Sequence, residues 1–285
     1  MKLLRYGPTG AEKPGVLDAS NRVRDLSSQI HDIDGDSLSP ESLAGLRTLD
    51  LESLPLVEGE PRLGSCIARP GKFVAIGLNY SDHATESGLP IPEEPVVFYK
   101  TDTAMCGPND DVIQPRGSSK LDWEIEIAIV IGSKAQYLDE DAAAQVIAGY
   151  CIVNDVSERA FQIDRGGSQW SKGKGCDTFG PTGPWLVTAD EIADVQNLGM
   201  WLDVNGKRMQ TGNTRNMIFN CSYLVSYLSQ FMTLMPGDII TTGTPPGVAL
   251  GHSEPPWLQP GDVMHLGIDG LGEQRQTVVT WPGQG

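Results

Sequence analysis

The chain has 285 residues, of which 39% are hydrophobic and 20% charged, and its formal net charge is −16. This composition excludes an intrinsically disordered chain, and the chain is long enough to bury a large core. The negative balance argues against nucleic acids and anionic membranes as partners, because both are polyanionic. An acidic protein with an acidic substrate needs local positive charge, from a metal ion or from Lys and Arg.

The start of the chain predicts a small N-terminal domain at residues 1–65. Short apolar runs predict strands at 2–6, 15–18 and 23–26, and leucine spacing predicts short helices within 36–51. The stretch 57–64 has few order-promoting residues, so we expect it to link this domain to a larger one at residues 66–285.

Strands and helices alternate after residue 70. Apolar runs predict strands at 73–78, 96–100, 123–131, 150–155 and 238–242. Helical spacing predicts helices at 79–88, 139–148 and 217–232, the second with Asp139 near its start and Gly149 just past its end. With 33 glycines and 20 prolines for turns, the pattern favours a β-rich α+β fold with a mixed sheet.

Cysteine spacing and apolar run length bear on location. The five cysteines are scattered and form no C-x-x-C pair, which favours reduced thiols and a cytoplasmic protein. No apolar run reaches the length of a signal peptide or of a membrane-spanning helix. We therefore expect no membrane partner.

Two glutamates share one face of the predicted strand 123–131. Side chains alternate along a strand, so Glu124 and Glu126 lie about 7 Å apart on the face that continues through Ala128 and Val130. If that face is buried, two like charges need a counter-charge, and oxygen ligands favour Mg²⁺, Mn²⁺ or Ca²⁺ over zinc. The alternative is a strand with one solvated face, on which both glutamates point into water.

Asp155 adds a third carboxylate at the end of the predicted strand 150–155. Its strand is almost continuously apolar and is therefore expected to be buried. If Asp155 meets Glu124 and Glu126, the three side chains form an oxygen ligand set that leaves positions open for water and substrate.

His83 and Glu86 are neighbours on the predicted helix 79–88. Glu86 can polarise the imidazole, which makes His83 a candidate general base near neutral pH. The hinge-like Gly77 and Gly88 on either side allow the segment to act as a lid. The alternative is an exposed helix with an incidental ion pair.

Two loops carry further candidate residues. The segment 165–175 is glycine-rich and basic but lacks the glycine offset of a nucleotide-binding P-loop. It is either a flexible surface loop or a loop that brings Lys172 or Lys174 to an anionic substrate. The segment 242–247 is either a plain turn or a site where hydroxyls and amides bind a carboxylate.

Six motifs, in order, resemble the fumarylacetoacetate hydrolase family. They cover about residues 70–270 and occupy 77–86, 95–100, 122–126, 149–157, 174–181 and 242–247. Each motif is weak alone, and their order makes the set specific. The segment before residue 65 resembles the short N-terminal domain of many bacterial members. The resemblance implies a mixed β-sheet roll of the fumarylacetoacetase C-terminal-domain type, a homodimer, and bound Mg²⁺ or Mn²⁺.

The resemblance also implies a role for each site residue. The implied residues are Glu124, Glu126 and Asp155 for the metal, His83, Glu86 and Lys174 for catalysis, and Lys100, Gln162 and Thr244 for the substrate. One departure is Cys176, which stands where many members have Phe, so we expect a smaller pocket wall there.

The implied reaction is hydrolysis of the C–C bond of a 2,4-dioxo acid to pyruvate and a carboxylic acid. The substrate is an acylpyruvate or a 2,4-dioxo-3-deoxy sugar acid, His83 activates the water, and Lys174 balances enolate charge. The alternatives are a ureidoglycolate lyase, or an isomerase or decarboxylase acting on a related oxo-acid. A non-catalytic binding protein is a further alternative, against which an intact His83–Glu86 pair argues.

Overall fold

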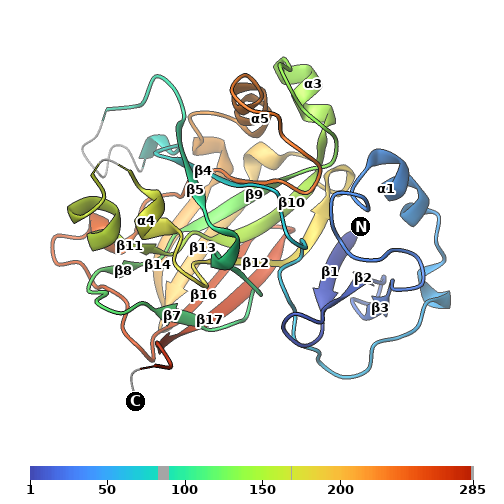
Figure 1. Cartoon of the computed structure of the whole chain (residues 1–285), viewed down its shortest axis with the longest axis horizontal. Coiled ribbons are helices and arrows are strands. Elements are labelled where there is room, and N and C mark those ends of the chain that lie inside the picture. Colours follow the sequence, from blue (N-terminus) through green and yellow to red (C-terminus); the bar gives the residue numbers. More distant parts are fainter. Residues whose placement is uncertain (83–89, 168, 284–285) are drawn as a thin grey trace.

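A ten-stranded mixed sheet forms the centre of the computed structural model, which describes residues 1–82, 90–167 and 169–283 (Figure 1). Its strands, in spatial order, are β3 (Val23–Asp25), β2 (Lys13–Leu17), β1 (Lys2–Tyr6), β12 (Gly180–Thr188), β10 (Ile147–Asn154), β9 (Ile125–Ile131), β15 (Ile239–Thr241), β4 (Phe73–Gly77) and β5 (Val96–Lys100), with β6 (Met105–Cys106) beside β12. The pairs β15–β4 and β12–β6 are parallel and the others antiparallel. The β-rich mixed fold is thus confirmed.

A second sheet of five strands packs on the central one. Its order is β14 (Lys207–Asn213), β13 (Gly199–Val204), β16 (Val263–Ile268), β17 (Gly272–Thr280) and β7 (Val112–Gln114), and a separate pair joins β8 (Leu121–Asp122) to β11 (Ser157–Glu158). Ile125, Ile127 and Ile129 of β9 share one apolar core with Leu202 of β13 and Leu266 of β16. This core holds the two sheets together.

The opposite face of β9 is also buried, and the N-terminal region covers part of it. Ala128 and Val130 belong to a second core with Leu38 and with Leu43 and Leu46 of α1 (Pro40–Arg47). Both faces of this strand are therefore removed from water, which rules out the solvated face considered as an alternative.

The N-terminal region extends the central sheet as well as covering it. Strand β1 pairs with β12, and β2 and β3 follow outward (Figure 1). Two bridges, Arg24 to Leu56 just before the expected linker 57–64 and Tyr6 to Leu63 within it, tie its ends to these strands. The division of the chain at residue 65 stays a prediction.

Two of the predicted helices are present but shorter. The helix α3 (Glu140–Gln145) is capped by Asp139, whose carboxylate accepts a hydrogen bond from the Ala142 amide at 2.9 Å. Gly149 does not end it, because β10 begins at Ile147 and a Cβ at Gly149 would lie 2.2 Å from the Val187 carbonyl oxygen of β12. This glycine therefore serves close strand packing.

The third predicted helix is α5 (Cys221–Ser229), capped by Asn220 and in contact with α3 (Figure 1). Of the predicted helix 79–88, residues 83–88 lie outside the described residues, and Tyr80 before them forms a β-bridge with Met217. Within the described ranges, no helix is long and apolar enough to cross a membrane.

Candidate metal centre and pocket

Antiparallel pairing of β9 with β10 brings the three carboxylates together. Ile125 pairs with Asn154, so the residues just outside this pair, Glu124 and Asp155, lie opposite each other. The Asp155 amide donates to the Glu124 carbonyl at 2.8 Å, which holds the two segments in register. Both residues stand just outside the strands that were predicted to contain them, since β9 begins at Ile125 and β10 ends at Asn154.

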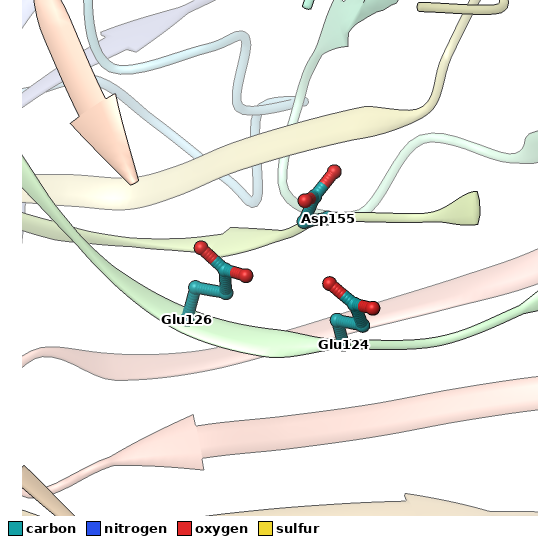
Figure 2. A group of neighbouring side chains, drawn as sticks. All are labelled: Glu124, Glu126 and Asp155. Carbon is teal, nitrogen blue, oxygen red and sulfur yellow. The ribbon is translucent and has the colours of Figure 1, made fainter. Parts of the chain in front are cut away.

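The carboxylates of Glu124, Glu126 and Asp155 form one buried group (Figure 2). One oxygen from each lies within 4.8 Å of the others, and the three residues are 7%, 1% and 0% exposed, respectively. Three oxygen donors at this spacing could hold a divalent cation, and their chemistry suits Mg²⁺ or Mn²⁺.

Lys174 and Lys100 supply positive charge beside this group. Lys174, at the end of α4 (Ser171–Lys174), has its Nζ 2.6 Å from Glu124 Oε2 and 2.8 Å from Asp155 Oδ2. Burial by itself lowers the pKa of Lys174, but the charges of Asp155 and Glu124 raise it above the ordinary value. Lys100 donates to Asp155 Oδ1 and to the Lys174 carbonyl oxygen. Burial lowers the pKa of Lys100 although Asp155 opposes that shift.

Arg159 is a site residue that the sequence did not reveal. Its guanidinium donates to Glu124 Oε1 at 2.6 Å, to Asp122 Oδ2 at 2.8 Å and to Gln162 Oε1 at 2.9 Å. Burial raises the pKa of the Glu124 carboxyl, but Lys174 and Arg159 outweigh this and lower the pKa to about 2. The signal available in the sequence was an Arg and a Gln three residues apart, shortly after Asp155.

Glu126 differs from Glu124 in its surroundings. Its Oε2 accepts the Gly243 amide at 2.9 Å, and within the described part of the chain no cationic side chain reaches ion-pair distance. Burial, followed by the charges of Asp155 and Glu124, raises the pKa of Glu126 well above its ordinary value. This carboxylate therefore needs a proton or a further cation.

A cavity of about 360 Å³ opens beside these groups. Its polar lining in the described part of the chain consists of Glu124, Glu126, Arg159, Gln162, Lys174 and Thr244. Its apolar lining consists of Ile76, Leu78, Phe98, Ile163, Trp170, Val248 and Leu250. The polar group is named here the charged end of the cavity and the apolar group its apolar end, and ligand sites often combine the two.

The predicted substrate residues occupy different places around this cavity. Gln162 lies in a π-helical turn, Ala160–Asp164, a conformation common at functional sites, and lines the cavity. Thr244 also lines it, but its hydroxyl donates to the Ile125 carbonyl at 2.8 Å and accepts from Gln210. Neither Lys100 nor Asp155 is among the described lining residues, and the two are buried against each other.

Lys172 of the basic loop and Cys176 just after it lie away from this cavity. Lys172 donates to the Arg165 carbonyl and is exposed, so Lys174 rather than Lys172 reaches the charged end of the cavity. Cys176 lines a separate hollow near Trp281, so the smaller residue there does not reshape this cavity. His83 and Glu86 lie outside the described residues, and their predicted roles stay predictions.

Most of the chain, including the candidate site, matches a known protein family. Residues 72–279 match the family described as fumarylacetoacetate (FAA) hydrolase, C-terminal. The chain belongs to this family. The carboxylates, Arg159 and Lys174 all lie within the matched segment of the fumarylacetoacetate hydrolase fold.

Relatives of this family member differ in how specifically they are named. A protein of Burkholderia ambifaria, named only as a hydrolase, is 59% identical over 278 residues and covers 97% of this chain and 98% of its own. Maleylpyruvate hydrolase of Sphingobium sp. SYK-6, solved with manganese(II) and pyruvate, is 28% identical with a TM-score of 0.81, covering 98% of this chain and 99% of its own. A 5-carboxymethyl-2-hydroxymuconate delta-isomerase of Mycobacterium smegmatis is 30% identical with a TM-score of 0.76, covering 99% of both chains.

Proposed function

We propose that this chain is a divalent-metal-dependent hydrolase that cleaves a 2,4-dioxo acid to pyruvate and a carboxylic acid. The observation that carries this proposal is the group of three buried carboxylates beside a cavity, which is also lined by the cationic side chains of Arg159 and Lys174. In the reaction, R–CO–CH₂–CO–COO⁻ and water give R–COOH and pyruvate. The substrate is an acylpyruvate or a 2,4-dioxo-3-deoxy sugar acid.

The residues present fit a divalent cation. Glu124, Glu126 and Asp155 would hold it, and the raised pKa of the buried Glu126 carboxyl indicates unbalanced negative charge at that position. Mg²⁺ or Mn²⁺ held there would supply Lewis-acid charge for an oxo-acid substrate. The neighbouring maleylpyruvate hydrolase, which contains manganese(II) and pyruvate, supports both the metal and the product.

The chain's own cations position an anionic substrate. Lys174 and Arg159 are fixed by their bonds to Glu124 and line the cavity, so they cost little reorganisation when negative charge develops on the departing pyruvate. Gln162 is held by Arg159 through its Oε1, which leaves its amide NH₂ as a donor for a substrate oxygen. Lys100 acts behind them by holding Asp155.

His83 and Glu86 complete the proposal from the sequence. They match the family's lid residues, and their spacing suits a histidine base polarised by a carboxylate. In this role His83 takes a proton from the water that attacks the 4-oxo carbon, and the C3–C4 bond then breaks.

A second candidate is isomerisation of a related unsaturated oxo-acid. It is favoured by the structural similarity to the hydroxymuconate isomerase, which shares the fold over nearly the whole chain. Decarboxylation and ureidoglycolate cleavage are further chemistries that such a metal site could support.

One panel separates these reactions. The purified protein is incubated with acylpyruvates, a 2,4-dioxo-3-deoxy sugar acid and ureidoglycolate, with Mg²⁺ or Mn²⁺, and with chelator as the control. We expect pyruvate and one equivalent of carboxylic acid, and no pyruvate once the chelator is present. Glyoxylate, carbon dioxide or an isomer with the same mass would each contradict the hydrolase.

Two further properties belong to the proposal. A homodimer is expected from the family, and light scattering after gel filtration measures it directly. A cytoplasmic location is expected from five cysteines that are all unpaired in the fold.

A further inference from the structure

The apolar end of the cavity is built around one indole ring. Trp170 lines the cavity, and its ring centroid lies 5.4 Å from that of Phe98. The Phe98 ring in turn has Lys174 Nζ 5.4 Å from its centroid. Phe98 thus contacts both Trp170 and the cationic Lys174 of the charged end.

Trp170 is also tied to Lys174 through the backbone. It immediately precedes α4, its carbonyl accepts the Gly173 amide at 2.9 Å, and Lys174 follows four residues later. Residues four apart on a helix are neighbours on its surface. The distance between the indole and the charged end is therefore set by one short helix.

The Trp170 indole packs against the backbone of Gly77. A Cβ at Gly77 would lie 2.2 Å from Cζ3 and 2.9 Å from Cη2 of Trp170, so the ring rests directly on this backbone. The next residue, Leu78, lines the cavity and has a φ of 54°, a left-handed conformation that is strained for leucine. Such strain is characteristic of binding sites, where the surrounding structure imposes it.

The cavity volume indicates a small ligand. At about 360 Å³ it lies near the lower end of the range of roughly 300–1,000 Å³ found for small-molecule sites. With an oxo-acid group held by the charged residues, little of this volume remains for a tail, and Trp170 supplies the largest apolar side chain among the described lining residues.

We propose that Trp170 is a specificity-determining residue that limits the length of the acyl group, so that the site accepts short-chain oxo-acids. This inference rests on the proposed function for the identity of the oxo-acid. Trp170 neither moves a proton nor binds the metal; it sets where the tail must stop. Removing the indole should open the cavity to longer tails.

The test measures binding rather than turnover. Straight-chain 2-oxo acids from pyruvate to 2-oxooctanoate are titrated by calorimetry into the Mn²⁺-loaded protein. Each buried methylene adds about fourfold in affinity where there is room for it. In the wild type this gain should stop after the first few carbons, whereas in Trp170→Ala it should continue for at least two more methylenes.

Three further variants make the result interpretable. Trp170→Phe keeps a smaller aromatic wall and should shift the limit less than alanine does. Gly77→Ala displaces the indole without removing it and should also alter the length profile. Trp281→Ala removes a partly exposed tryptophan that lines a different hollow, so its profile should match the wild type.

The outcomes separate this inference from the proposed hydrolase. The inference is wrong if Trp170→Ala folds and gives the wild-type length profile. If Trp170→Ala does not fold, the inference is wrong when both Trp170→Phe and Gly77→Ala give the wild-type profile. If the variants shift the profile but no 2,4-dioxo acid releases pyruvate, the hydrolase fails and Trp170 still limits ligand length. A wild type that binds no 2-oxo acid at any length would overturn both.

Discussion

Asp122 and Arg159 form a buried ion pair, in which Arg159 Nε lies 2.8 Å from Asp122 Oδ2. The same carboxylate accepts the amides of Ala249 at 2.7 Å and Leu250 at 3.1 Å. Arg159, held by Asp122, also donates a hydrogen bond to Glu124, and Leu250 forms part of the apolar lining. One buried aspartate thus orients both the charged and the apolar ends of the cavity.

Asp122→Asn should therefore loosen the site. Asparagine has one acceptor oxygen where Asp122 serves four donors, so at least one buried donor loses its partner, at about 1–3 kcal/mol. We expect the free energy of unfolding, measured by urea denaturation, to fall by that amount. Asp111→Asn, at an exposed position, is the control and should change stability by less than about 0.5 kcal/mol. Equal midpoints for both variants would contradict the role of Asp122.

Glu126→Gln tests the metal centre without relying on activity. The variant removes one of three carboxylate donors, so the affinity for Mn²⁺ should fall at least about tenfold, or roughly 1.4 kcal/mol. The stabilisation of the fold by added Mn²⁺ should shrink in step, as thermal unfolding at increasing Mn²⁺ would show. Exposed Glu60→Gln should respond to Mn²⁺ as the wild type does. Full Mn²⁺ affinity in Glu126→Gln would exclude this carboxylate as a ligand.

Gly243 is required by its backbone as well as by its contacts. Its φ is +91°, its amide binds Glu126, and a Cβ there would lie 2.9 Å from Asn79 Cβ. Gly243→Ala should lower the free energy of unfolding by about 1–3 kcal/mol and weaken Mn²⁺ binding. In Gly206→Ala the φ of +77° is also positive but no atom lies within 4 Å, so this control measures the φ effect alone. Chemical denaturation and Mn²⁺ titration of both variants provide the comparison.

The core shared by the N-terminal region and the central sheet predicts joint unfolding. Leu38 is fully buried in the core that includes Ala128 and Val130 of β9. Leu38→Ala should cost about 2–5 kcal/mol and shift a single cooperative transition. Leu56→Ala, at a position 40% exposed, should have little effect. Two separate transitions in calorimetry would show instead that the two regions unfold independently.

Asp18 predicts a dependence of stability on acid. Burial alone would raise its pKa, but hydrogen bonds from the Arg22 and Ser20 amides and from Arg24 lower it from 3.8 to about 2. Because the folded pKa is the lower one, this contribution is present above about pH 4 and is lost as the pH falls toward 2. Asp18→Asn should flatten the fall in urea midpoint between about pH 4 and 2. Exposed Asp36→Asn should keep the wild-type slope.

Local pattern was enough for the parts of the site that lie on one strand or follow it directly. Alternation continued back from β9 to the residue before it puts Glu124 and Glu126 on one side, and an apolar strand leads to Asp155. The same local rules located the N-terminal cap of α3 at Asp139. They failed at Gly149, because the close approach of β12 is a contact with a strand more than thirty residues away.

Strand β12 shows why the rest needed the fold. Its sequence begins Gly-Pro-Thr-Gly-Pro, which has the composition of a turn, yet it forms the neighbour of β10 and of β1. Pairing with strands already in place outweighs the weak local preference, because every buried backbone group needs a hydrogen-bond partner.

By itself the sequence determined the family, the β-rich class and the three acidic residues of the candidate metal site, since these depend on residue type, order and short-range period. Only the tertiary structure decided that Arg159 bridges Asp122 and Glu124, that Lys100 pairs with Asp155, and that the Trp170 ring packs on Gly77. The physical reason is that ion pairs and ring contacts form between side chains that strand pairing brings together. The number of residues between two positions does not determine how far apart they lie in the fold.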